Sequence, residues 1–157
     1  MTEASPGTFI VTRSTVIAAP PEAIFPLIDD FHGWEGWSPW EKVPGDALAK
    51  TYSGAPRGVG AIYAWTGKKT GQGRMEITGS TPSSRVDIDL QFIKPFKTNN
   101  MTWFTLTPAP VGVQVTWTMT GKTTLISRLM SLVMSMDKAV GGAFAQGLAT
   151  LKTIAEG

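Results

Sequence analysis

Short β-rich runs, separated by turn residues about every ten positions, fill the sequence between residues 41 and 121. Glycine or proline occurs in each turn, and the turns fall at 55–58, 67–71, 80–83 and 108–110. This spacing is typical of consecutive antiparallel strands joined by hairpins. We therefore expect strands over 47–54, 59–67, 72–80, 85–94, 101–107 and 112–120, and a further one in the β-branched run 8–19.

Two of these runs alternate apolar and polar residues, which predicts a sheet with one dry and one wet face. The apolar positions are Val86, Ile88, Leu90 and Phe92 in the first run and Val113, Val115, Trp117 and Met119 in the second. The last block, 124–156, has the apolar spacing of a helix that could cover the dry face. At about 1.5 Å per residue, such a helix would cross the whole sheet. Gly141 and Gly142 predict a bend or a close backbone approach near its middle.

A shorter helix is predicted directly after the first strand. Pro20-Pro21-Glu22 is typical of a helix start, and apolar residues follow helical spacing up to Phe31. Pro26 should bend or shorten this helix. A second short helical turn is expected across 32–38, and it should stop at Pro39, because the residue before a proline avoids the helical region.

Composition argues against several classes of function. Fourteen basic and twelve acidic residues give a net charge of +2, and the basic residues are scattered along the chain, so nucleic-acid binding is not predicted. The chain has no cysteine and one histidine, so we expect no metal site and no other cofactor. Neither a leader segment nor a membrane-spanning run is apparent. We expect a cytoplasmic monomer or small homo-oligomer.

The order of strand, two small helices, six strands and one long helix resembles the helix-grip superfamily (SRPBCC), an α+β fold class that includes START-like and Bet v 1-like proteins. The residues that carry the resemblance are APPEAIFPLIDDFHGWEGWSPW, GVGAIYAW, GRMEIT and GVQVTWTMTG, which with the long helix span about 9–155. The first of these runs is most similar to the bacterial polyketide cyclase/dehydrase-like branch. The resemblance implies one domain over 1–157, in which a curved seven-stranded antiparallel sheet wraps on the C-terminal helix. It also implies a largely apolar cavity between sheet and helix.

The residues expected to line this cavity are apolar, aromatic or methionine side chains of the dry sheet face and the helix stripe. The sheet and the segment before it supply Trp37, Trp40, Tyr63, Trp65, Met75, Ile77, Ile88, Leu90, Phe92, Trp103, Trp117 and Met119. The helix supplies Leu129, Met130, Val133, Met136, Val140 and Phe144. The alternative is that all of these side chains fill a solid core.

The run HGWEGWSPWEK, residues 32–42, holds three tryptophans spaced three apart. The resemblance places this run near the end at which the family's cavity opens. We expect Trp37 and Trp40 to pack inward at the cavity rim and Trp34 to be partly exposed beside the opening. Because Gly33 and Gly36 make the backbone pliable, the run could act as a gate.

Few polar residues are candidates for catalysis. His32 is the only imidazole and therefore the simplest general base near neutral pH. Tyr63 falls among the wall residues, and Asp137 lies near the helix stripe. These three are weak candidates, because nothing in the sequence places them together.

Three functions are compatible with these features. The first is the binding or transport of a small hydrophobic ligand, which could be lipidic, aromatic or polyketide-like. The second is a polyketide cyclase/dehydrase-type enzyme, which would assist an aldol or dehydration reaction without a metal or nucleotide cofactor. A weaker alternative is a regulator that binds a partner protein. A fold alone does not decide among them.

Overall fold

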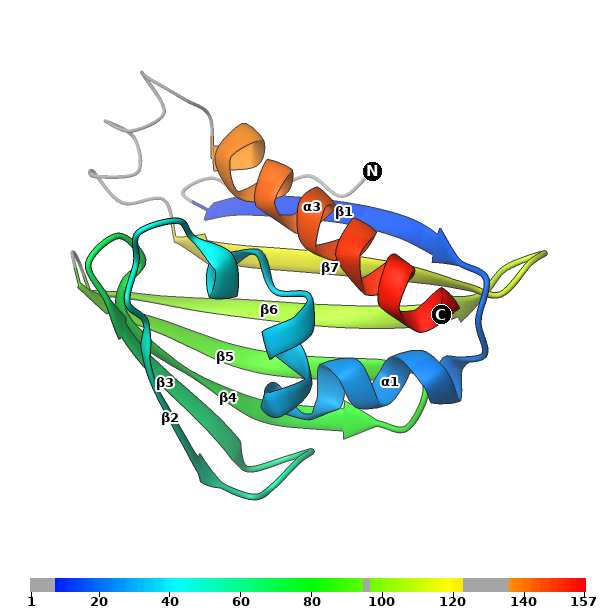
Figure 1. The fold of residues 1–157 in the computed structure, drawn as a ribbon, viewed down its shortest axis with the longest axis horizontal. Coiled ribbons are helices and arrows are strands. Elements are labelled where there is room, and N and C mark those ends of the chain that lie inside the picture. The colour runs from blue at the N-terminus through cyan, green and yellow to red at the C-terminus, as the bar shows by residue number, and fades with distance from the viewer. Residues whose placement is uncertain (1–7, 95–96, 123–135) are drawn as a thin grey trace.

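The computed structural model of the protein describes residues 8–94, 97–122 and 136–157. Seven strands form one antiparallel sheet in the order β1-β7-β6-β5-β4-β3-β2. The strands are β1 (Thr8–Ile17), β2 (Ala49–Gly54), β3 (Ala61–Gly67), β4 (Gly71–Thr81), β5 (Arg85–Lys94), β6 (Thr98–Pro108) and β7 (Val113–Lys122). Consecutive hairpins run from β2 to β7, and β1 pairs with β7. The predicted curved seven-stranded sheet is therefore confirmed (Figure 1).

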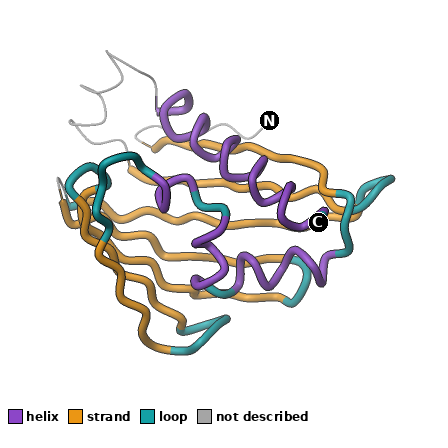
Figure 2. The backbone as a smooth tube through the Cα atoms, in the orientation of Figure 1, coloured by secondary structure: helices purple, strands orange, loops and turns teal. Residues whose placement is uncertain are grey.

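All described helices lie on one face of this sheet (Figure 2). They are α1 (Pro21–Asp29), the 3₁₀ helices η1 (Phe31–Gly36) and η2 (Pro39–Lys42), and α3 (Met136–Glu156). The predicted helix over 124–156 is thus confirmed from Met136 onward, and its first part lies outside the described residues. The backbone leaves α1 in extended conformation at Asp30, whose side chain accepts the N–H of His32 and so caps η1.

The alternation of apolar and polar residues places one sheet face against the helices, as predicted. Val86 and Ile88 on β5 are fully buried, and so is Val115 on β7. Cross-strand pairing extends this face to β6, because Val86 pairs with Phe104, which is also fully buried. The core therefore lies between the inner face of the sheet and the helix layer.

Two glycines set how closely α3 approaches its neighbours. At Gly141 a Cβ atom would overlap the guanidinium of Arg13 on β1, which binds the carboxylate of Asp137 through two hydrogen bonds of 2.9 Å. At Gly147 a Cβ atom would lie 2.9 Å from Cδ of Pro39 on η2. The predicted close approach at 141 therefore occurs, and the neighbour is a side chain rather than backbone, while α3 continues without a break.

The two ends of the sheet differ. We call the end formed by the β3–β4 turn, the β5–β6 turn and the last residues of β7 the cavity end. The opposite end, under α1 and the second half of α3, is the packed end (Figure 1). Its core side chains are almost completely inaccessible to solvent, and include Ile17, Ile24, Ile28, Ile77, Ile88, Leu148 and Leu151.

Candidate functional site

A cavity of about 330 Å³ lies at the cavity end. Its walls come from the inner face of the sheet, from η1 and η2, and from α3. The apolar lining residues are Phe31, Trp34, Trp40, Val43, Leu48, Tyr63, Trp65, Met75, Leu90, Phe92, Trp117, Met119, Val140 and Phe144. The polar ones are Ser38, Glu41, Lys69, Thr70 and Thr102. A volume of roughly 300–1,000 Å³ with mostly apolar walls and few polar groups is typical of sites for small organic ligands.

The sheet side of the cavity is built from one row of cross-strand pairs. Tyr63 on β3 pairs with Met75 on β4, which pairs with Leu90 on β5. Paired residues in an antiparallel sheet project from the same face, so these three side chains form a continuous floor. Further along β3, Trp65 pairs with Gly73, and the indole lies over this glycine because no side chain occupies the space.

Trp117 on β7 separates the cavity from the packed end. Its ring stacks on Phe144 of α3 at a centroid distance of 3.8 Å and on Phe104 of β6 at 4.7 Å. Its indole N–H donates to the hydroxyl of Thr102 over 2.9 Å, and that hydroxyl donates to a backbone oxygen of β7. Because stacking and hydrogen bonding both fix the indole, it forms a rigid end wall of the cavity.

The structure corrects the prediction for one of the three clustered tryptophans, Trp34, which is buried rather than partly exposed. Trp37 packs inward as predicted. Trp40 is 38% exposed but lies at the cavity rim as predicted, with its ring edge-on to Trp117 and Phe144. Trp34 is buried because Phe31–Gly36 is a 3₁₀ helix, in which residues three apart eclipse one another. Phe31, Trp34 and Trp37 therefore share the inward face, while η2 starts a new direction at Pro39.

The indole N–H groups of the two buried tryptophans bind α1. Trp34 donates to the carbonyl of Ile28 and Trp37 to that of Leu27, each over 2.8 Å. These carbonyls lie in the last turn of α1, where no helical N–H follows to bind them. The tryptophans thus cap α1 and fix its position. Whether residues 32–42 act as a gate stays a prediction.

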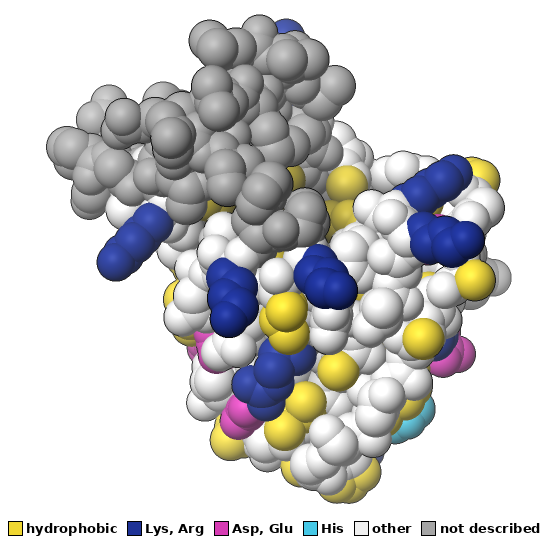
Figure 3. Space-filling view, turned by 90° about the vertical axis from the view of Figure 1, so that its left-hand side faces the viewer, with side chains coloured by type: hydrophobic (Ala, Val, Ile, Leu, Met, Phe, Trp, Pro, Cys, Tyr) yellow, Lys and Arg dark blue, Asp and Glu magenta, His cyan; other side chains and the backbone are white. Residues whose placement is uncertain are grey.

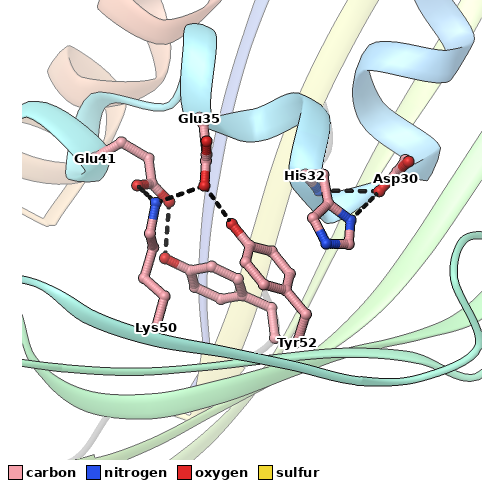
Figure 4. Close-up of polar contacts among 7 residues, drawn as sticks. Asp30, His32, Glu35, Glu41, Lys50 and Tyr52 are labelled. Atoms are coloured by element: carbon pink, nitrogen blue, oxygen red, sulfur yellow. Dashed lines mark hydrogen bonds and ion pairs between the residues drawn. The ribbon is translucent and has the colours of Figure 1, made fainter.

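A cluster of carboxylates, tyrosines and one lysine joins η1 and η2 to β2 and β3 beside the cavity (Figure 4). The Nζ atom of Lys50 binds Glu35 over 2.8 Å and Glu41 over 2.9 Å. Tyr63 donates its hydroxyl proton to the other oxygen of Glu41 over 2.7 Å, and Tyr52 donates to Glu35 over 2.8 Å. The side chain of Glu41 is only 7% exposed. Its charge is therefore held inside by Lys50 and Tyr63.

Burial and hydrogen bonding shift the pKa values of this cluster. Burial, together with the hydrogen bond to Glu41, raises the pKa of Tyr63 well above 10.0, and burial with the bond to Glu35 raises the pKa of Tyr52 to about 12. The bond from Lys50, followed by that from Tyr52, lowers the pKa of Glu35. For Lys50, burial lowers the pKa, but the hydrogen bonds to Glu35 and Glu41 outweigh it and leave the pKa raised. Near neutral pH both tyrosines are therefore protonated and Lys50 is charged.

The three predicted catalytic candidates do not meet. Tyr63 lines the cavity. His32 lies outside it, more than half exposed, with its ring stacked on Tyr52 at 3.9 Å and Nδ1 2.8 Å from Asp30. Asp137 is exposed and paired with Arg13. His32 and Asp137 therefore do not line the cavity with Tyr63, and a catalytic role for any of the three stays a prediction.

Four of the predicted wall residues do not line the cavity. Trp37, Ile77 and Ile88 are buried in the packed core. Trp103 projects from the outer face of the sheet, because it pairs with the outward-facing Asp87, and the guanidinium of Arg85 lies 5.5 Å from the centre of its ring. Position along the strand decided the cases of Ile77 and Ile88, the inward face shared with η1 decided that of Trp37, and the outward orientation of position 103 on β6 decided that of Trp103.

The remaining predicted wall residues fall into two groups. Those that line the cavity are Trp40, Tyr63, Trp65, Met75, Leu90, Phe92, Trp117, Met119, Val140 and Phe144. The predictions for Leu129, Met130, Val133 and the side chain of Met136 lie outside the described part of the chain. That any of these residues contacts a ligand stays a prediction.

Sequence reasoning missed several residues of the cavity, above all Glu41 and Thr102. Thr102 pairs with Ile88, and the alternation Thr102, Phe104, Leu106 could have predicted its inward position. For Glu41 no signal exists in the sequence, because its burial depends on Lys50 from β2 and Tyr63 from β3. Among the described residues, no group of three or more His, Cys, Asp or Glu side chains could hold a metal ion. Within that same part of the chain, no helix is long and apolar enough to cross a membrane.

Comparison with known proteins adds a family and a fold. The family described as polyketide cyclase / dehydrase and lipid transport matches residues 8–156. No curated protein matches the chain in sequence.

Among solved structures, the chain is similar to protein MLL2253 from Mesorhizobium loti (TM-score 0.67, 19% identity, covering 93% of this chain and 96% of that one). It is also similar to the di-domain ARO/CYC BexL from the BE-7585A biosynthetic pathway (TM-score 0.72, 14% identity), covering 98% of this chain and 52% of that one. A third similar structure is Ara h 8.0201 (TM-score 0.63, 14% identity, covering 94% of this chain and 99% of that one). At these identities, the likenesses establish the fold.

Proposed function

The chain belongs to the polyketide cyclase/dehydrase and lipid transport family, and from this premise we propose that it binds a small, flat hydrophobic molecule in the cavity between sheet and α3. One observation carries the proposal: a space of about 330 Å³ is walled by aromatic rings and thioethers. Rings offer flat contact surfaces, and the thioethers of Met75 and Met119 adapt to varied shapes. The same walls would disfavour a charged or strongly hydrated guest.

The polar groups of the wall restrict the chemistry of the ligand further. Tyr63 uses its only proton on Glu41, and Thr102 uses its proton on a backbone oxygen. Both hydroxyl oxygens keep acceptor capacity, and the carboxylate of Glu41 is itself an acceptor. We therefore expect a ligand with an apolar body and a hydroxyl or N–H group that donates to this side of the cavity.

Intrinsic fluorescence provides a direct test, because four tryptophans line the cavity: Trp34, Trp40, Trp65 and Trp117. Titration with phenylnaphthylamine, a neutral aromatic probe, should quench tryptophan emission at a saturable site. Val140→Phe fills the cavity and should weaken probe binding by about tenfold or more, which corresponds to roughly 1.4 kcal/mol. Trp65→Ala should weaken it as well.

Trp103→Ala is the matched control, because it removes a tryptophan from the outer face of the same sheet. It should leave probe affinity unchanged. Native mass spectrometry of the purified protein would then identify a bound natural guest. Equal affinity in the wild type and in Val140→Phe would disprove binding in this cavity.

The pair Tyr63–Glu41 supports a second candidate, a cyclase or dehydrase activity. The Tyr63 oxygen can accept a proton from an acidic C–H or O–H group of a bound poly-β-ketone while its own proton passes to Glu41. On this reading Glu41→Gln should abolish turnover of a poly-β-keto thioester but retain binding of phenylnaphthylamine. If the wild type yields only the spontaneous products of the uncatalysed reaction, the enzymatic candidate is rejected and the binding function stands.

A further inference from the structure

Five lysines gather at the cavity end although they are far apart in the sequence. Lys68 and Lys69 form the tip of the β3–β4 hairpin, Lys94 and Lys97 flank the β5–β6 turn, and Lys122 ends β7. All five side chains are exposed. The antiparallel order β7-β6-β5-β4-β3 brings these positions to one end of the sheet. Figure 3 looks onto this end and shows several dark blue side chains spread across it and few magenta ones.

Carboxylates do not neutralise this group, which we call the lysine rim (Lys68, Lys69, Lys94, Lys97 and Lys122). Across residues 8–94, 97–122 and 136–157, no ion pair includes any of its five ammonium groups. Elsewhere most cations are paired: the cations with a carboxylate partner are Arg13, Lys50, Arg74, Arg85 and Lys152. The lysine rim is thus a concentrated positive surface on a chain whose net charge is only +2.

Among the described residues, the carboxylate of Asp46 lies within the rim and offsets one of its five positive charges without forming an ion pair with any of these lysines. Asp46 accepts the backbone N–H groups of Lys68 and Thr70 and the hydroxyl of Thr70, at 2.7–2.9 Å. These bonds fix the β3–β4 turn. Lys69 donates to the carbonyl of Pro44 over 2.6 Å and also lines the cavity. The positive surface therefore adjoins the cavity itself.

The rim contains lysine and no arginine, which bears on the kind of partner. Arginine recognises a single phosphate or carboxylate through a rigid two-pronged geometry, whereas lysine is a flexible point charge. Five exposed lysines on separate turns suit a diffuse anionic surface better than one defined anion. Ile93, which is 37% exposed beside Lys94, adds an apolar contact among the charges. Basic residues around an apolar one are typical of surfaces that rest on anionic lipid headgroups.

We propose that the lysine rim docks the cavity end of the protein on an anionic lipid bilayer. Docking would bring the cavity against the bilayer, where a poorly water-soluble guest concentrates; this last step rests on the proposed binding function. The attraction should be weak for each residue and additive. Each lysine near such a surface contributes about a fivefold change in the partition coefficient.

The test measures co-sedimentation of the full chain with vesicles of phosphatidylcholine containing phosphatidylglycerol, against vesicles of phosphatidylcholine alone. The wild type should bind the anionic vesicles preferentially, and added salt should weaken binding because it screens the charges. The variant Lys94→Gln/Lys97→Gln/Lys122→Gln should lose about a hundredfold in partition coefficient. It avoids Lys69, which lines the cavity.

A pair of single substitutions provides the matched control. Lys97→Gln should reduce binding to anionic vesicles about fivefold. Arg57→Gln removes the same charge from an exposed residue between β2 and β3 at the packed end, and should leave binding unchanged. Equal loss in both variants would show a non-directional effect of net charge and would overturn the proposal.

Three further outcomes would also overturn the proposal: equal binding of the wild type to both kinds of vesicle, no loss in the triple variant, or binding to heparin or an acidic protein without binding to vesicles. Phenylnaphthylamine titration of the same proteins without lipid separates this proposal from the binding function. If the triple variant loses vesicle binding but keeps probe affinity, docking on the bilayer is supported. If neither the wild type nor any variant binds the probe, but the triple variant loses vesicle binding, docking on the bilayer is supported and the proposed binding function is rejected.

Discussion

The packed end and the cavity end are built on the same strands, yet their inner faces differ in the size and chemistry of the side chains. On β5, Ile88 is fully buried, whereas Leu90, two residues further, borders the cavity. On β4 the same contrast holds between Ile77 and Met75. Branched aliphatic side chains, together with the rings of Trp37 and Phe104, fill the packed end. Aromatic rings, thioethers and a hydrogen-bonded carboxylate line the other end, where packing is incomplete.

The comparison teaches that tight packing and the cavity lie at opposite ends of the same strands. Helix α1, held by Trp34 and Trp37, covers the packed end, so tight packing there stabilises the fold. At the cavity end, hydrogen bonds from Lys50 and Tyr63 to Glu41 keep η2 in place. A void can persist there because the other end supplies the apolar burial that stabilises the fold.

The largest expected effect comes from truncating the same residue type at each end. Phe104→Ala removes a fully buried ring that touches Trp34, Trp37 and Trp117, and should cost about 3–5 kcal/mol of unfolding free energy. Phe92→Ala removes a partly buried ring beside the existing cavity. It should cost no more than about 2 kcal/mol, because less apolar area is lost. Urea denaturation measures both, and equal costs would contradict the division between the two ends.

The next effect comes from enlarging a valine at each end. Val115→Phe forces a ring into a fully buried position and should destabilise the protein by about 1–3 kcal/mol. Val140→Phe places the same ring in the cavity. It should leave stability within about 1 kcal/mol of the wild type, because the space is already empty. Thermal unfolding of the two variants distinguishes these outcomes; a large loss in Val140→Phe would show that the cavity end is solid.

A smaller effect is a loss of stability in alkaline solution, which should be confined to the cavity end. Tyr52 has a pKa of about 12 in the folded protein against an ordinary value of 10.0. Because the folded value is raised, the associated stability is fully present below pH 10.0 and is lost as the pH rises toward about 12. The chain has only two tyrosines, so tyrosinate absorbance reports Tyr52 and Tyr63 alone. Little tyrosinate should form near pH 10.0.

The variant Glu35→Gln provides the control for this titration. It removes the charge that accepts the Tyr52 hydroxyl proton, so the pKa of Tyr52 should fall toward its ordinary value, although burial keeps part of the increase. Hydrogen exchange at high pH should then show β2 and η1 opening before the packed end. An unshifted Tyr52 in the wild type would show that the cluster is not formed in solution.

The smallest expected effect concerns Asp137. Its carboxylate is paired with Arg13 on the surface, with both side chains substantially exposed. Asp137→Asn should therefore change stability by less than about 1 kcal/mol. It should leave phenylnaphthylamine affinity unchanged, because Asp137 does not line the cavity. A tenfold loss of probe affinity would restore Asp137 as a site residue.

Much of the fold could be predicted from residue patterns alone. Turn spacing located the hairpins, and the alternation in β5 and β7 assigned their inner faces correctly. The error at Trp103 came from placing a large aromatic residue inward, although Phe104 and Leu106 fix the opposite parity for β6. The error at Trp34 came from treating 32–38 without regard to the threefold repeat of a 3₁₀ helix.

The sequence by itself determined which face of β5 and β7 is dry, because side chains alternate strictly along a strand. It could not determine whether the space above that face is filled, because this depends on which helix packs there. Nor could it show that Glu41 is buried against Lys50 and Tyr63, or that scattered lysines meet at one end of the sheet. Those contacts join residues far apart in the chain, so only the tertiary structure decided them.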